Sequence, residues 1–106
     1  MSDMSLVSKS FKTFMTEAPA HQAAWMEATG KLEGASRLDP KTGELAYIAV
    51  LAAARLESGL LFHVRHAKSL GATREEIISA VLIGLPAVGN AVTQALPAAL
   101  DAYDTG

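Results

Sequence analysis

The distribution of apolar residues is the feature that most constrains the fold of this chain. Half of the 106 residues are apolar, yet only six are aromatic, so alanine, leucine, valine and isoleucine supply most of the apolar mass. Alanine is the strongest helix former and is depleted in strands. No stretch alternates apolar and polar residues for long enough to form a strand. The sequence therefore predicts an all-α protein with a single domain over residues 1–106.

Helix signals in the first third of the chain predict two helices. Residues 4–16 place methionine, valine and phenylalanine at helical spacing, with two lysines opposite, which is the pattern of an amphipathic helix. Pro19 interrupts this pattern and opens a second helix, in which we interpret His21 as structural. Gly30 and Gly34 weaken the end of the second helix, and a polar connection follows.

The middle of the chain has a clear helix start. Asp39 can cap free amides, and Pro40 at the first helical position loses no hydrogen bond. The helix that follows is apolar nearly all round and is predicted to run to about Leu56, so we expect it to be central or buried between subunits. Gly59 breaks the pattern, and a short helix is predicted from about Leu60.

Three further signals divide the rest of the chain, which gives about five to six helices in all. Gly71 is predicted to end the short helix as a C-cap glycine. Thr73 and Glu76 have the spacing of a capping box, which opens the next helix. Gly84-Leu-Pro86 should kink or end that helix, and a last helix is predicted to reach about Tyr103.

Composition and charge exclude several classes of function. The formal net charge is −2, which argues against a nucleic-acid-binding face. Cysteine is absent, which excludes disulfides and thiolate nucleophiles. The start lacks a secretory signal pattern, and the longest apolar runs are shorter than a membrane span. We expect a cytoplasmic protein with no membrane partner, and a homo-oligomer, because so small a chain cannot bury this much apolar surface alone.

Glu44 is the first candidate for chemistry, since it is the only acidic residue between Asp39 and Glu57. One interpretation is structural, because a carboxylate near a helix N-terminus complements the helix dipole. The other is functional: the helix is otherwise apolar, so Glu44 would face a cleft in which desolvation raises its pKa and suits it to proton transfer. The sequence leaves both interpretations open.

Two histidines, His63 and His66, lie three residues apart and are therefore neighbours on one helix surface. The apolar pattern predicts that His63 faces inwards and that His66 lies nearer the edge. An inward histidine is either a hydrogen-bonded core residue or a catalytic group. Together with Glu44 the pair could form a two-histidine, one-carboxylate metal site. The spacing is a weak signal and no further ligand is evident, so we predict no metal and no cofactor.

Three segments resemble the carboxymuconolactone decarboxylase and alkylhydroperoxidase D (AhpD)-like family in their order and spacing. They are LDPKTGELAYIAVLAAA, HVRHAKSLGATREEI and GLPA. The resemblance covers about Leu38 to Tyr103, so residues 38–104 are identified as the family core and residues 1–37 as the helices that precede it. It implies an AhpD-like helical bundle that assembles as trimers or hexamers.

The resemblance also assigns residues. In the peroxidase branch of the family the functional set is a glutamate, a C-x-x-C pair and a histidine, and these positions fall on Glu44, Leu56, Gly59 and His63. Without a thiolate there is no nucleophile for a peroxide and no disulfide to cycle. The resemblance therefore does not extend to thiol peroxidase activity.

The decarboxylase branch lacks the cysteine pair, keeps the histidine, and often continues with G-x-P-A, which Gly84-Leu-Pro86-Ala87 matches. The resemblance implies cofactor-free acid–base chemistry on a small carboxylated substrate, with Glu44 and His63 as the catalytic groups. We predict that His66 and Arg55 bind the substrate; Arg55 is the arginine nearest in sequence to the proposed cleft. The alternative is a non-catalytic oligomeric member that binds a small molecule or a partner protein.

Overall fold

The computed structural model describes residues 6–105, and this range is helical and contains no strand, which confirms the prediction of an all-α protein. The chain divides into two compact units, residues 1–38 and residues 39–106. The sequence predicted a single domain, with residues 1–37 as the helices that precede the family core. Each unit is described by itself below.

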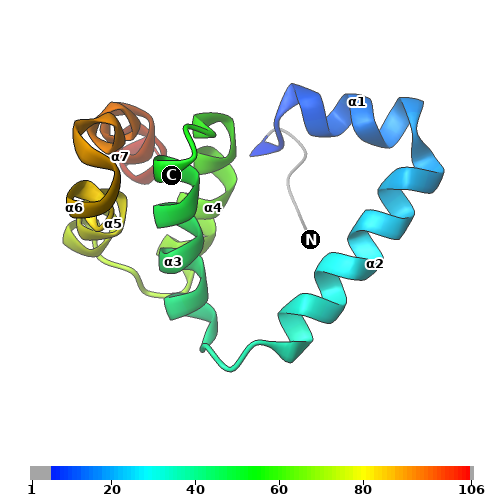
Figure 1. The fold of residues 1–106 in the computed structure, drawn as a ribbon, viewed down its shortest axis with the longest axis horizontal. Coiled ribbons are helices and arrows are strands. Elements are labelled where there is room, and N and C mark those ends of the chain that lie inside the picture. Colours follow the sequence, from blue (N-terminus) through cyan, green and yellow to red (C-terminus); the bar gives the residue numbers. More distant parts are fainter. Residues whose placement is uncertain (1–5, 106) are drawn as a thin grey trace. The chain divides into compact units, whose positions relative to one another are not determined.

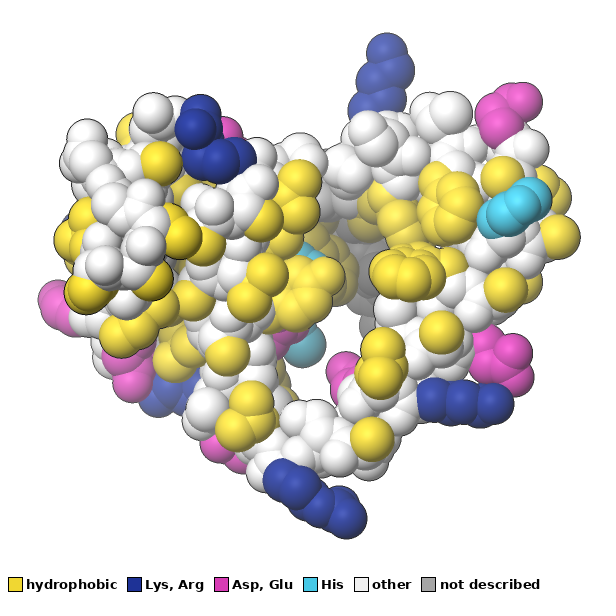
Figure 2. Space-filling model, in the orientation of Figure 1, with side chains coloured by type: hydrophobic (Ala, Val, Ile, Leu, Met, Phe, Trp, Pro, Cys, Tyr) yellow, Lys and Arg dark blue, Asp and Glu magenta, His cyan; other side chains and the backbone are white. Residues whose placement is uncertain are grey.

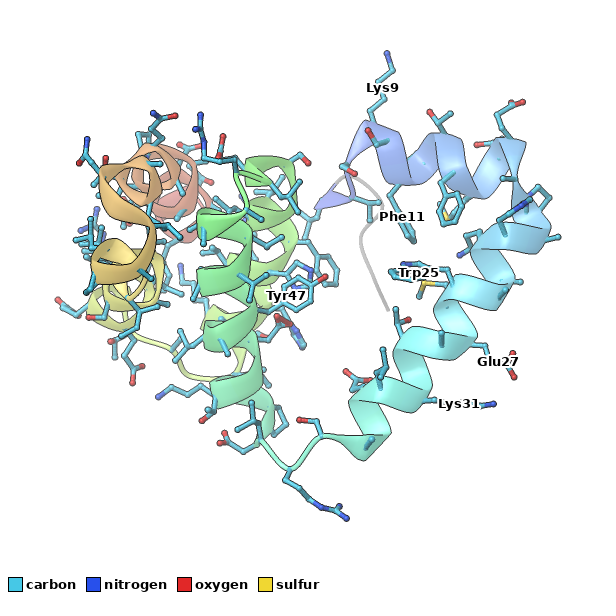
Figure 3. All side chains as sticks on the ribbon, in the orientation of Figure 1. Lys9, Phe11, Trp25, Glu27, Lys31 and Tyr47 are labelled. Atoms are coloured by element: carbon cyan, nitrogen blue, oxygen red, sulfur yellow. The ribbon has the colours of Figure 1, made fainter. Side chains whose placement is uncertain are left out.

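The first unit is a pair of helices. Helix α1 spans Lys9–Glu17 and α2 spans Pro19–Ala35; Met4 of the predicted first helix lies outside the described residues. Figure 3 shows Phe11 on α1 and Trp25 on α2 on the inner side of the bend between the two helices, and Figure 2 shows hydrophobic side chains gathered there. Neither helix has a buried residue. Among residues 6–38, therefore, the first unit has no buried core.

The second unit contains the remaining elements. They are α3 (Pro40–Ala53), the 3₁₀ turn η2 (Glu57–Gly59), α4 (Leu60–Ser69), α5 (Arg74–Leu82), α6 (Leu85–Val88), the 3₁₀ segment η3 (Gly89–Ala95) and α7 (Leu96–Thr105). Helix α3 packs against α4 and α5, and α7 packs against the same two helices, so the four longest helices of the unit close a ring (Figure 1).

The core lies inside this ring and is made of small and medium aliphatic side chains. Its members recur at helical spacing, which gives each helix one inward face. The thirteen buried residues are Ile48, Leu51, Ala52, Leu60, Val64, Ala67, Ala72, Ile77, Val81, Val92, Ala95, Ala99 and Ala102. All thirteen belong to the second unit, and within residues 6–105 no polar or charged residue is buried.

Local capping fixes the helix ends, largely where the sequence predicted them. The Asp39 carboxylate accepts a hydrogen bond from the Thr42 amide at 3.3 Å. Thr73 and Glu76 form a reciprocal capping box at the start of α5. Gly71 has a φ of 97°, and the Ala72 amide donates to the Ala67 carbonyl, which is the Schellman arrangement that ends a helix.

The end of α3 differs from the prediction. The helix stops at Ala53 instead of about Leu56, because Arg55 adopts the left-handed conformation with a φ of 63°. The Leu56 amide then donates to the Leu51 carbonyl at 2.9 Å, so this too is a Schellman end. Glycine is the usual residue at such a position, and arginine there strains the backbone.

The helical stretch Arg74–Thr105 has the length and apolar character of a membrane-crossing segment. In the structure it is divided among α5, α6, η3 and α7, with a break at Gly89, where φ is 82°. Part of its apolar surface forms the core, through residues such as Ile77 and Ala99. The most apolar 18-residue window of the stretch is 17% buried in the structure, so the core accounts for part of its apolar character.

Candidate functional site

Helix α4 has a buried face and, beside α3, a face that carries the candidate site. Leu60, Val64 and Ala67 form its buried face. His63 and His66 share the face beside α3, where Glu44 lies. The site is therefore built between two neighbouring helices of one rigid core, and its geometry depends on the packing of α3 against α4.

The carboxylate of Glu44 bridges the two histidines. Nδ1 of His63 lies 2.8 Å from Oε1 and 3.3 Å from Oε2 of Glu44, and Nδ1 of His66 lies 2.5 Å from Oε2. The side chains of Glu44, His63 and His66 are 13%, 24% and 46% exposed. The structure thus brings together three of the four residues that the sequence predicted for the site, with His63 the more buried histidine, as expected.

The pKa of Glu44 is lower than its ordinary value of 4.5. Burial by itself raises this pKa, but the hydrogen bonds from His63 and His66 and the charges of the two rings lower it by more. Desolvation thus acts in the expected direction, but the expectation of a raised pKa for Glu44 is wrong. Glu44 also lies beyond the first turn of α3, where the helix dipole has little effect, so neither sequence-based interpretation describes it fully.

The bridging carboxylate determines which nitrogen carries a proton in each of the two rings. An ionised carboxylate can only accept hydrogen bonds, so Nδ1 carries the proton in His63 and in His66. In a neutral imidazole the other nitrogen, Nε2, is then an acceptor with a free lone pair. The arrangement presents two oriented imidazole bases on one anionic support.

Two aromatic side chains complete the surroundings of His63. The ring of Tyr47 stacks on the ring of His63, with 4.2 Å between centroids and 24° between planes. The ring of Phe62 meets His63 edge to face at 5.2 Å and lies 6.0 Å from the ring of His66. Tyr47 projects from α3 (Figure 3), half exposed, three residues after Glu44. Sequence reasoning missed Tyr47, although its spacing from Glu44 places both on one helix face.

Arg55, the fourth predicted site residue, does not contact this cluster. It lies just past the C-terminal end of α3, and at 1.5 Å per residue the helix separates it from Glu44 by roughly 15 Å. Its guanidinium donates to the Gln94 side chain at 2.5 Å and lies 3.7 Å from the Glu57 carboxylate. The structure does not support Arg55 as a substrate anchor in the Glu44 cluster.

The other four cationic side chains of residues 39–105 also have partners elsewhere. Arg65 donates to the Ala102 carbonyl and the Thr105 hydroxyl, and Lys68 donates to the Tyr103 carbonyl. The remaining two form ion pairs, Lys41 with Glu76 and Arg74 with Asp104. Among residues 39–105, therefore, each lysine and arginine side chain has its partner away from the Glu44 cluster.

The resemblance places the two cysteines of the peroxidase branch at Leu56 and Gly59. Leu56 is 55% exposed. Gly59 is packed against Leu51, since a Cβ at Gly59 would lie 3.2 Å from both Leu51 methyl carbons. Because the chain has no cysteine, this surface contains no thiol that could react with a peroxide.

Among residues 6–105, no group of three or more acidic, histidine or cysteine side chains has the geometry to hold a metal ion. In the Glu44 cluster the carboxylate accepts hydrogen bonds from Nδ1 of His63 and of His66. The arrangement is that of a hydrogen-bonded acid–base cluster.

Comparison with known proteins extends these observations. The model of the carboxymuconolactone decarboxylase family matches residues 19–101, which cover α2 and all of the helices around the Glu44 cluster. The comparisons matched the chain to no curated protein and to no solved structure.

Proposed function

Because the chain belongs to the carboxymuconolactone decarboxylase family, we propose that it is a cofactor-free enzyme that transfers protons on a small carboxylated substrate, in a decarboxylase-like reaction. The observation that carries the proposal is the carboxylate of Glu44 bridging Nδ1 of His63 and of His66. Such a carboxylate fixes the tautomer of each ring and stabilises the imidazolium form when Nε2 takes up a proton.

The proposed reaction balances with one proton from water, which replaces the carboxyl group on the substrate carbon. The bond between the substrate carboxylate and its neighbouring carbon breaks, carbon dioxide leaves, and the electron pair remains as an enolate. The imidazolium of His63 then gives its Nε2 proton to the carbon and recovers one from water. His63 thus acts as general acid, and Glu44 holds the ring and offsets its charge.

We assign substrate binding to His66. Its ring is the more exposed of the two, and its Nε2 can hold the carboxylate or carbonyl oxygen of the substrate when protonated. Arg55, which shared this role in the sequence-based prediction, interacts with Gln94 and Glu57. The assembly into trimers or hexamers and the cytoplasmic location stay predictions.

A second candidate function is non-catalytic binding of a small molecule or a partner. The packing of Leu51 against Gly59 favours it, because side chains fill the space beside one of the family's two cysteine positions. Solvent access to the histidines separates the two candidates: a catalytic site needs Nε2 of His63 to reach a guest, whereas a scaffold does not.

The test is a panel of small lactone acids and β-keto monocarboxylic acids, incubated with the purified protein in deuterium oxide. Carbon dioxide release and deuterium incorporation at carbon are measured together, because both follow from the proposed step. His63→Gln should lower kcat about 100-fold or more, the usual size of a general acid–base contribution. Glu44→Gln should lower it comparably, and treatment with EDTA should leave it unchanged.

His21→Gln is the matched control, since His21 is an exposed histidine of α2 outside the cluster. It should retain full activity. Full activity in His63→Gln on a substrate that the wild type turns over would contradict the assignment. If no acid in the panel releases carbon dioxide or gains deuterium, the non-catalytic candidate is favoured.

A further inference from the structure

We infer that Tyr47 is a positioning residue, which fixes the ring plane of His63 so that Nε2 points at the substrate. The inference rests on the proposed function, because a fixed ring plane matters for a ring that transfers a proton. Neither the family match nor the sequence pattern assigns a role to this tyrosine.

The contacts of His63 act on different degrees of freedom of its ring. The hydrogen bond from Nδ1 to Glu44 at 2.8 Å selects one of the two ring orientations related by a 180° flip, because the flip would point a carbon at the carboxylate. That bond tolerates tilting of the ring. The stack on Tyr47, at 4.2 Å and 24°, tolerates the flip and resists the tilt. Together the two contacts leave one orientation.

The exposure of Tyr47 argues that the stack is more than core packing. The side chain is 50% exposed, so burial fixes it only in part. Its hydroxyl donates no hydrogen bond within the described residues, whereas that of Tyr103 donates to the Ala72 carbonyl. The aromatic face is therefore the part of Tyr47 that contacts the site.

Helix α3 presents Glu44 and Tyr47 as a unit. They are three residues apart, which places them one above the other on a helix surface. Phe62, on α4, closes the edge of the His63 ring at 5.2 Å and 76°. The ring is thus held at Nδ1, over one face and at one edge, and Nε2 is the polar atom that stays free of these contacts.

The experiment measures the Nδ1 proton of His63 by NMR, without any substrate. A proton held between imidazole and carboxylate exchanges slowly with water, and its exchange rate reports how often the hydrogen bond opens. Loss of an aromatic pair, worth about 0.5–1.5 kcal/mol, should speed the exchange roughly two- to tenfold in Tyr47→Leu. His63→Gln and His66→Gln assign the two ring protons.

Tyr47→Phe keeps the ring and should exchange at the wild-type rate. Val50→Ala, which shortens another exposed side chain of α3, is the matched control and should also match the wild type. An unchanged rate in Tyr47→Leu, or an equally fast rate in Tyr47→Phe, would overturn the inference. Circular dichroism confirms that each variant is folded, and Tyr47→Ala replaces the leucine variant if that one is not.

The NMR measurement uses no substrate, so it distinguishes a failure of this inference from a failure of the proposed function. Faster exchange in Tyr47→Leu with no turnover of any substrate would support the positioning role and count against the enzyme. If a substrate is found, Tyr47→Leu should lower kcat with little change in KM, and Tyr47→Phe should restore it. A change confined to KM would instead assign Tyr47 to substrate binding.

Discussion

The carboxylate of Glu44 accepts hydrogen bonds from two imidazole rings, which suits it to hold the rings and not to transfer a proton itself. The pKa of Glu44 lies below its ordinary value because the hydrogen bonds and charges of His63 and His66 outweigh the effect of burial. Glu44 therefore stays ionised near neutral pH, where it supports the charge that an imidazole gains during proton transfer. In the proposed reaction the proton moves on His63, and the carboxylate of Glu44 holds the ring in place.

Glu44 should make the stability of the protein depend on acid. Its pKa is lower in the folded state, so its contribution is present above the unfolded value of 4.5 and is lost as pH falls through the folded value. Thermal unfolding followed between pH 7 and pH 3 should show a larger fall in Tm for the wild type than for Glu44→Gln. At pH 7 the variant should be less stable by about 1–3 kcal/mol.

Equal falls in Tm for the two proteins over this range would show that Glu44 contributes nothing through its ionisation. His21→Gln is the control for a general effect of altered charge, because His21 lies on α2, away from Glu44 in sequence and in unit. It should follow the wild-type curve.

Three residues of the Glu44 cluster were predictable from the sequence, but the misplaced Arg55, the missed Tyr47 and the direction of the Glu44 pKa were not. Glu44, His63 and His66 stand out because a polar group on an apolar helix needs a reason to be there. The direction of the Glu44 pKa depends on two hydrogen bonds between α3 and α4, and the Tyr47 stack depends on the same packing. Spacing along one helix cannot supply either, because both are contacts between helices.

At the level of elements, the N-cap residues began helices, and Gly71 ended one, where the sequence predicted. The end of α3 was not predicted, because it is made by an arginine. Asp39, Gly71 and Thr73 act through their own turns, so local sequence suffices to predict them. The left-handed Arg55 carries no such local signal. Gly34 lies in the last turn of α2, which ends at Ala35.

The strained end of α3 gives a prediction about stability. Arg55→Ala and Arg55→Gly both remove the contacts with Gln94 and Glu57, and only glycine accepts a φ of 63° without strain. The glycine variant should therefore be more stable than the alanine variant by about 1 kcal/mol, measured by urea unfolding. Gly71→Ala is the control in the opposite direction, because it replaces a glycine by alanine at a left-handed position. A Cβ there meets no atom within 4 Å, so any loss of stability comes from backbone strain alone.

Equal stability of the two Arg55 variants would show that the surroundings of Arg55 relax the strain. A loss of stability in Gly71→Ala would then still establish that a left-handed residue at a helix end matters in this protein.

At the level of the whole molecule, the two units differ in how they are stabilised. Every buried side chain of the described residues belongs to the second unit, and the Glu44 cluster lies there too. The first unit has two helices of 9 and 17 residues without a buried residue. Isolated helices of such lengths are marginal in water.

We therefore expect residues 39–106 to fold alone and residues 1–38 not to. The longer fragment should give a helical circular dichroism spectrum and a cooperative thermal transition, and the shorter should be mostly unstructured. The full chain is the reference for both. A second unit that fails to unfold cooperatively would show that the first unit supplies part of its stability.

The side chain of Leu51 bears on how this protein could change its chemistry in evolution. It fills the space next to Gly59, where the redox members of the family carry a sulfur atom. Reinstating that sulfur by a single substitution would press the new side chain against a buried leucine. A side chain at Gly59 would therefore require the Leu51 methyl groups to shift by a few tenths of an ångström, so a thiol at this position is linked to the packing of the core.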